Sequence, residues 1–77
     1  MTRKNYYFDY IAPTKGNILS KRQQSRDFSS VDEAVRDAQS RQNKGKIVQA
    51  QIWDKTNTIG HKIVGSVGTT GKFRRGI

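Results

Sequence analysis

Nine Lys and Arg residues carry the strongest chemical signal in this chain, because they fall in three groups. The groups are Lys21, Arg22 and Arg26; Arg41, Lys44 and Lys46; and Lys72, Arg74 and Arg75. The 77 residues hold 15 Lys and Arg against 6 Asp and Glu, a formal net charge of +9. Like charges repel in a compact chain, so this excess indicates an anionic partner rather than a requirement of the fold. Nucleic acid is the foremost such partner, because clustered cations displace the counterions condensed on its phosphates.

A short alternating run adds hydrogen-bonding groups and an aromatic ring to these cations. Gln49, Gln51 and Trp53 are spaced two apart, so they would share one face of an extended strand. Gln and Arg side chains read base edges through paired hydrogen bonds. An exposed aromatic ring stacks on unpaired bases. A strand face of this composition suits nucleic acid.

The register of the segment before the helix decides which cations join that face. Alternate residues give either Arg22, Gln24 and Arg26 or Lys21 and Gln23, and both possibilities stay open. In either case the sequence predicts a nucleic-acid-binding module whose basic and polar sheet face is extended by a basic tail. Duplex DNA is slightly favoured over RNA, because one Trp is a thin stacking platform.

Each of these features also has a purely structural explanation. Any single cation group fits a solvated surface, and charge on an edge strand protects it from pairing with another chain. Trp53 also fits as a packing residue, and the tail as a solubilising end. Because three separate groups all carry positive charge, an anionic partner is favoured over a purely structural explanation.

The sequence offers little for catalysis or for metal binding. His61 is the only histidine and Cys is absent, so His61 is interpreted as a solvated or edge residue. A helix cap explains the adjacent Asp32 and Glu33. The glycines from Gly65 to Gly71 lack the Lys-Ser/Thr ending of a phosphate-binding loop. The expectation is a protein that is not an enzyme and has no cofactor and no metal.

The aromatic segment 6–12 predicts a strand, with its even-numbered residues on one face. Turn chemistry follows at 13–17, where Pro, Gly and Asn favour a hairpin. The return strand would run over 18–28, apolar at first and then polar.

The helix is the clearest element. Ser30 with Glu33 three residues on reads as a capping box, and Gly45 supplies a stop signal. One apolar face follows the helical period: Val31, Ala34, Val35 and Ala38.

After the helix the period returns to two. Val48, Ala50 and Ile52 would face the core, whereas Ile47 would share the opposite face with the alternating run that ends at Trp53. A polar turn at 54–58 and a strand over 59–67 would complete a second hairpin.

These elements predict an α+β fold of order β-β-α-β-β, in which one helix packs on one face of a mostly antiparallel four-stranded sheet. Residues 1–67 would form one small domain and residues 68–77 a flexible, basic, Gly-rich tail. The absence of Cys and of an apolar run near ~20 residues indicates a cytoplasmic protein without membrane segments.

Four pieces occur in order between Tyr7 and about Gln39: the aromatic strand 7–10, the turn at 15–16, the basic pair 21–22, and Phe28 ahead of 30–34. In these features the stretch resembles the N-terminal arm-type DNA-binding domain of tyrosine recombinases. The resemblance implies a sheet that enters the major groove with a helix packed behind it. A second hairpin after the helix departs from that family.

In length and layout the whole chain is similar to small, uncharacterised bacterial and phage β-β-α-β-β modules, some of them anti-CRISPR proteins. That similarity implies an alternative function: a small phage- or bacterium-encoded protein that binds and inhibits a host protein or nucleoprotein complex. Its basic surface would then meet an acidic protein surface. The sequence does not indicate an oligomeric state.

Overall fold

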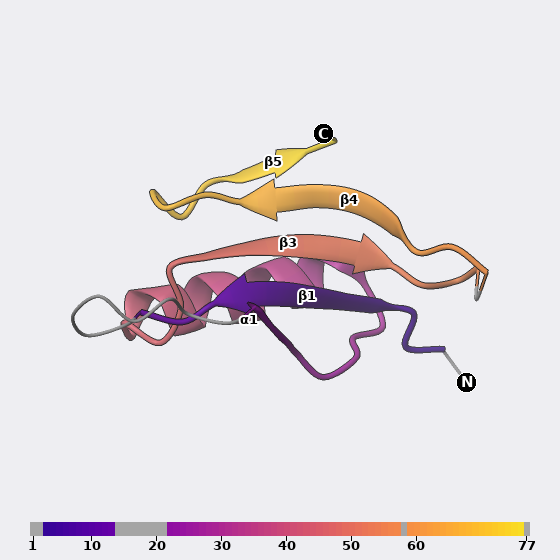
Figure 1. Ribbon diagram of the computed structural model, residues 1–77, viewed down its shortest axis with the longest axis horizontal. Helices are drawn as coiled ribbons and strands as arrows, with labels where there is room; N and C mark the ends of the chain where they lie inside the picture. Colours follow the sequence, from indigo (N-terminus) through magenta and orange to yellow (C-terminus); the bar gives the residue numbers. More distant parts are fainter. Residues whose placement is uncertain (1–2, 14–21, 58, 77) are drawn as a thin grey trace.

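The fold is α+β, with one helix packed against a five-stranded antiparallel sheet (Figure 1). The computed structural model describes residues 3–13, 22–57 and 59–76. The elements are β1 (Tyr6–Ile11), β2 (Arg22–Gln24), α1 (Val31–Asn43), β3 (Gln49–Asp54), β4 (Lys62–Val67) and β5 (Phe73–Arg75). The strands lie in the order β2-β1-β3-β4-β5. In Figure 1, α1 lies behind the sheet, and its C-terminal end is at the same end of the molecule as the β4–β5 turn.

The ends of α1 form as the sequence predicts. The Ser30 hydroxyl oxygen accepts a hydrogen bond of 3.2 Å from the Glu33 amide, and the Glu33 carboxylate accepts one of 2.9 Å from the Ser29 hydroxyl. At the other end Gly45 has a φ of 73°, a left-handed conformation that glycine adopts readily. This cap directs the chain from the helix back toward β3.

A thin core lies between α1 and the sheet. It consists of Phe8, Phe28, Ala34, Val35, Ala38, Ile47, Ala50, Ile52 and Val67. The helix contributes small side chains to it, so its axis can lie close to the strands. Burying each large aromatic or aliphatic side chain contributes about 1.5–3 kcal/mol, which makes the two Phe residues the main hydrophobic anchors.

The opposite face of the sheet, called here the open face, is covered by no helix from the described residues. Strand alternation places Asp9 of β1 on it because Phe8 is in the core, and Gln51 of β3 because Ile52 is in the core. The alternation predicted for segments 6–12 and 49–53 is confirmed. The described part of the chain contains no helix with the length and hydropathy of a membrane span.

The structure corrects the predicted strand count. The sequence predicts four strands and a tail after Val67. Instead, Phe73–Arg75 pair with β4 as a fifth strand, in register Gly65 with Arg75 and Val67 with Phe73. A turn between β4 and β5, in which the Gly71 amide donates to the Gly68 carbonyl at 3.0 Å, makes this return possible.

Two residues after the helix exchange their predicted faces. Ile47 is 3% exposed and belongs to the core, whereas Val48 is 38% exposed. Strand β3 begins only at Gln49, so the period of two does not extend back to these positions. The prediction for Ile47 and Val48 was wrong because they lie in the connection from the helix cap.

The second strand ends earlier than predicted, and the fourth begins later. Within residues 22–28, the described part of the predicted return segment 18–28, only Arg22–Gln24 form a strand, followed by an isolated bridge between Tyr6 and Phe28. Strand β4 starts at Lys62 rather than Ile59. Most of the predicted turn at 13–17, together with Lys21, lies outside the described residues.

Candidate functional site

A row of polar side chains crosses all five strands on the open face. The strand pairing aligns Gln24 with Asp9, Asp9 with Gln51, Gln51 with Ser66, and Ser66 with Arg74. Neighbouring strands lie about 4.7–4.9 Å apart, so this polar row extends over roughly 19 Å. It presents amide, carboxylate, hydroxyl and guanidinium groups along one line.

An arginine lies at each edge of the polar row. Arg74 ends it on β5, and Arg22 lies beside Gln24 on β2, opposite Ile11. The Arg22 Nε donates to Asp9 Oδ2 at 3.0 Å, so that ion pair balances the carboxylate within the row. The register left open by the sequence is thereby resolved: Arg22 and Gln24 are on the open face, while Gln23 is on the helix side opposite Tyr10.

Trp53 is paired with Tyr7 at one end of the open face. It lies between Tyr7 and Ile63 in the strand pairing. Tyr7 is 8% exposed, its Oη lies 2.8 Å from His61 Nδ1, and the two rings meet edge to face. Trp53 is itself only partly exposed. Both the Tyr7 ring and much of the Trp53 ring therefore serve packing, which limits their use as a stacking platform.

Burial at this end of the sheet affects hydrogen bonding and titration. Burial of Tyr7 raises the pKa of its phenol, and the nearby Asp9 charge raises it further. Asp9 Oδ1 and Trp53 Nε1 are buried and have no hydrogen-bond partner among the described residues. The open face therefore holds hydrogen-bonding capacity that the described part of the chain does not use.

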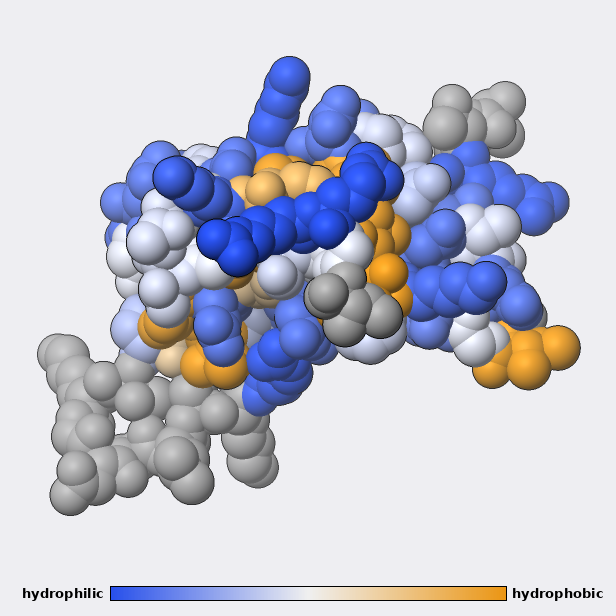
Figure 2. All heavy atoms as spheres, turned by 90° about the horizontal axis from the view of Figure 1, so that it is seen from above, coloured by the Kyte–Doolittle hydropathy of each residue, from blue (hydrophilic) through white to orange (hydrophobic). Residues whose placement is uncertain are grey.

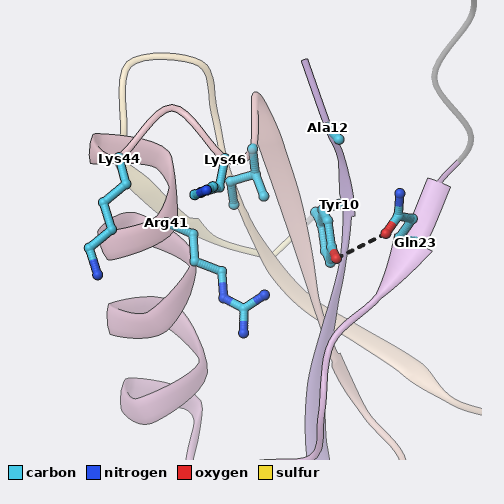
Figure 3. Close-up of a pocket in the computed structure, with 7 residues that line it drawn as sticks. Tyr10, Ala12, Gln23, Arg41, Lys44 and Lys46 are labelled. Carbon is cyan, nitrogen blue, oxygen red and sulfur yellow. Dashed lines mark hydrogen bonds between the residues drawn. The ribbon is translucent and has the colours of Figure 1, made fainter. Parts of the chain in front are cut away.

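A second surface lies on the helix side of the sheet. Between the end of α1 and strands β1 and β2 there is a groove of about 410 Å³, called here the basic groove. Its lining residues are Tyr10, Ala12, Gln23, Arg41, Lys44, Lys46 and Ile47 (Figure 3). One predicted cation group thus lines one groove, and on the sheet side of this groove the Tyr10 hydroxyl donates to Gln23 Oε1 at 3.1 Å.

Arg26 does not reach the open face. Its guanidinium carbon lies 4.3 Å from the centre of the Phe28 ring, and it lines a cavity with helix residues such as Glu33 and Asp37. The register breaks after Gln24, because Tyr6 pairs with Phe28 instead of continuing the β1–β2 ladder. That break turns Arg26 toward the helix.

The cations of the last segment are divided between the faces of the sheet. Arg74 is on the open face beside Ser66, and Arg75 is opposite Gly65, the next position along the strand. Lys72 is exposed just before β5, where its carbonyl accepts a hydrogen bond of 3.2 Å from the Gly68 amide. Both faces of the sheet therefore carry cations, whereas the sequence predicts one basic and polar face extended by a basic tail.

Hydrophilic residues cover most of the surface seen from the β5 edge, with apolar residues visible between them (Figure 2). Three cations within the described residues form ion pairs: Arg22 with Asp9, Arg41 with Asp37, and Lys55 with Asp27. Exposed pairs of this kind contribute about 0–1 kcal/mol each. The other described cations keep most of the net positive charge accessible.

Sequence reasoning missed Tyr10 and Gln23 as partners of the cations at the helix end. These groove residues come from separate segments, and only the fold brings them together. One signal was available: Gly45 as a left-handed cap turns the chain so that Lys46 returns to the last turn of the helix.

Comparison of the chain with protein-family models, with curated proteins and with solved structures finds no match. Within residues 3–13, 22–57 and 59–76, no three His, Cys, Asp or Glu side chains gather as metal ligands would.

Proposed function

We propose that this chain is a nucleic-acid-binding module without catalytic activity, that it prefers duplex DNA to RNA, and that the open face makes the contact. One observation carries the proposal: a line of hydrogen-bonding side chains with an arginine at each edge, set in register by the pairing of five strands.

The order of groups along the polar row matches the layout of a duplex. The major groove is about 12 Å wide, which is less than the roughly 19 Å over which five strands extend. The central amide and hydroxyl groups of Gln51 and Ser66 would face base edges. Arg22 and Arg74, at the two edges, would meet the phosphates that flank the groove, where charge contributes most of the affinity.

The helix supports this arrangement from behind. It covers only the face that carries Phe8 and Ile52, so the open face is left for a large partner. In the arm-type DNA-binding domains that the segment from Tyr7 to about Gln39 resembles, the sheet meets DNA and the helix packs behind it, and the proposal uses the same placement.

The test is a titration of the full chain with labelled duplex DNA, single-stranded DNA and single-stranded RNA at two salt concentrations. We expect duplex DNA to bind most tightly. The logarithm of the affinity should fall with the logarithm of salt concentration by about 0.9 for each phosphate contact.

Two arginine variants locate the surface. Arg74→Gln should reduce the salt slope on duplex DNA by about 0.9. Arg36→Gln removes the same charge from an exposed helix position and should leave the slope nearly unchanged. Equal effects of the two variants would show that net charge, rather than the open face, makes the contact.

Absence of binding to all three polymers at ~50 mM salt would reject the proposal. The alternative function would then be favoured: a small inhibitor whose basic surface binds an acidic site on a host protein or nucleoprotein complex. Capture of a specific protein from nuclease-treated lysate, lost at high salt, would support that alternative.

A further inference from the structure

The cap at the end of α1 brings two cations together where apolar side chains usually meet. The Lys46 amide donates to the Arg41 carbonyl at 2.9 Å, and the Gly45 amide donates to the Gln42 carbonyl at 3.0 Å. This pair of bonds is a Schellman motif, in which the second residue after the helix commonly makes an apolar contact with the last turn. Here the two positions are Lys46 and Arg41, which repel each other unless an anion lies between them.

The helix dipole explains only part of this arrangement. Cations near a helix C-terminus gain about 0.3–1 kcal/mol each, and that accounts for Arg41 and Lys44 being near the end of α1. It does not account for their position at a concave surface with an aromatic wall. In Figure 3, Arg41 extends from the helix toward the strand that carries Tyr10, and Lys46 lies on the loop that follows the helix.

The groove has the size and the composition of a small-molecule site. Its volume of about 410 Å³ falls in the range of roughly 300–1,000 Å³ typical of such sites. Tyr10, Ala12 and Ile47 form an apolar wall, and the Gln23 amide lies beside them. A planar ring would find both a flat surface and a hydrogen-bonding group there.

The charges of the groove match a phosphate monoester. Arg41, Lys44 and Lys46 line it, and one carboxylate, Asp37, forms an ion pair with Arg41, with 2.9 Å between Arg41 Nε and Asp37 Oδ2. The balance is about two positive charges. A phosphate monoester carries about −1.5 to −2 at pH 7.

We infer that the basic groove binds a single nucleotide, with the phosphate held by Arg41, Lys44 and Lys46 and the base against Tyr10. This site lies on the helix side of the sheet and does not depend on the open face. The ligand has two sources of the same chemistry: a free mononucleotide, or the 5′-phosphorylated end of a strand.

Isothermal titration calorimetry on the full chain tests the inference, with adenosine 5′-monophosphate, adenosine and inorganic phosphate as separate ligands. The monophosphate should bind at least about tenfold more tightly than either part alone, because only it uses both walls of the groove. Equal binding of monophosphate and inorganic phosphate, or no binding of the monophosphate, would overturn the inference.

Matched Lys variants locate the site. Lys46 is exposed, so Lys46→Gln should fold normally, and it should weaken binding of the monophosphate by about tenfold, as expected for a lost charge-assisted hydrogen bond. Lys62→Gln removes one charge near Asp54, on a different part of the surface, and should have little effect. Equal weakening by both variants would overturn the groove as the site.

Single-stranded oligonucleotides with and without a 5′-phosphate then distinguish the sources. Tighter binding of the phosphorylated strand, lost in Lys46→Gln, would support the groove as a site for strand ends. If the two oligonucleotides bind equally while binding of the mononucleotide depends on Lys46, the groove is supported as a site for free nucleotides. Arg74→Gln should leave mononucleotide binding unchanged. The test of DNA binding by the open face and the test of nucleotide binding by the basic groove can therefore fail independently.

Discussion

The ring of Phe73 lies against the backbone of Gly65, so that strand β5 packs where a side chain on β4 would otherwise stand. A Cβ at Gly65 would be 2.7 Å from the nearest ring carbon of Phe73 and 2.3 Å from the Arg74 carbonyl oxygen. Both distances are too short for any residue but glycine, so the fifth strand depends on this position.

Replacing Gly65 should therefore displace β5. Gly65→Ala forces overpacking, and we expect a loss of about 1–3 kcal/mol in the free energy of unfolding. Affinity for duplex DNA should fall with it, because Arg74 loses its place at the edge of the polar row. Chemical denaturation and the DNA titration measure the two effects. Gly68→Ala is the matched control, since a Cβ there meets nothing within 4 Å; equal losses in the two variants would contradict the prediction.

The left-handed cap at Gly45 gives a second prediction, which concerns the basic groove. Gly45→Ala should cost about 1–2 kcal/mol in the free energy of unfolding, because its φ of 73° is unfavourable for a residue with a side chain. It should also weaken binding of adenosine 5′-monophosphate, because Lys46 depends on this cap for its position.

Gly60→Ala serves as the control for this cap, since its Cβ would lie in open space. Denaturation followed by circular dichroism, together with calorimetry, measures both effects. Unchanged stability and unchanged binding in Gly45→Ala would show that the cap does not position the groove.

Alkaline pH should destabilise the protein through Tyr7. Burial raises the phenol pKa in the folded state above its ordinary value of about 10. The folded state therefore binds this proton more tightly than the unfolded state does. The resulting contribution to the free energy of unfolding is fully present below about pH 10. It is lost as the pH rises through the folded-state pKa.

Comparison with Tyr7→Phe isolates this effect. The variant loses the hydrogen bond to His61, about 0.5–1.5 kcal/mol at neutral pH, but its stability should fall less steeply above pH 10. Urea denaturation at several pH values from 8 to 11 provides the measurement. Parallel stability curves for the two proteins would exclude Tyr7 as the titrating group.

Acid should destabilise the protein through Asp54, whose pKa is shifted in the opposite direction to that of Tyr7. The Thr56 hydroxyl and the Thr56 amide both donate to Asp54 Oδ1, at 2.6 and 2.8 Å, and these hydrogen bonds lower the pKa of its carboxyl group. The resulting stabilisation is present above the unfolded pKa of about 3.9. It is lost as the pH falls through the lower folded-state value.

Asp54→Asn keeps the acceptor oxygen but removes the titration. The stability difference between wild type and Asp54→Asn should be constant above about pH 5 and shrink below about pH 4. Thermal unfolding from pH 2 to pH 6 measures it. A difference that stays constant down to pH 2 would mean that this carboxyl group has the same pKa in both states.

The helix and the alternation within β1 and β3 could be predicted because their signals are local. Ser30, Glu33 and Gly45 specify the ends of α1, and the period of two places Gln49 and Gln51 opposite the core. These positions depend only on neighbouring residues, and the structure confirms them.

The fifth strand could not be predicted, because its signal is not local. The segment around Phe73 is rich in glycine and in cations, a composition typical of a flexible tail. It becomes a strand only by pairing with β4, where Phe73 packs against Gly65. Arg26 shows the same limit, since its direction depends on a break in the pairing between β1 and the segment after β2.

The open face could be predicted in part from local sequence signals, whereas the basic groove could not. Strand alternation predicted Gln51 on the open face, whereas the alignment of Ser66 and Arg74 with it depends on the pairing of β4 with both neighbours. The basic groove needs Tyr10 and Gln23 to meet the helix end, and that meeting is a property of the assembled fold alone.

A single amide side chain joins three segments at the groove end of the molecule. Gln42 Nε2 donates to the Val48 carbonyl at 2.7 Å and to the Gly68 carbonyl at 2.8 Å. The last turn of α1, the entry to β3 and the exit from β4 should consequently open as one cooperative unit when the native protein fluctuates. Backbone amides in these three segments would then exchange with solvent deuterium at a common rate. A ligand that binds to and stabilises one of the segments would slow amide exchange in all three.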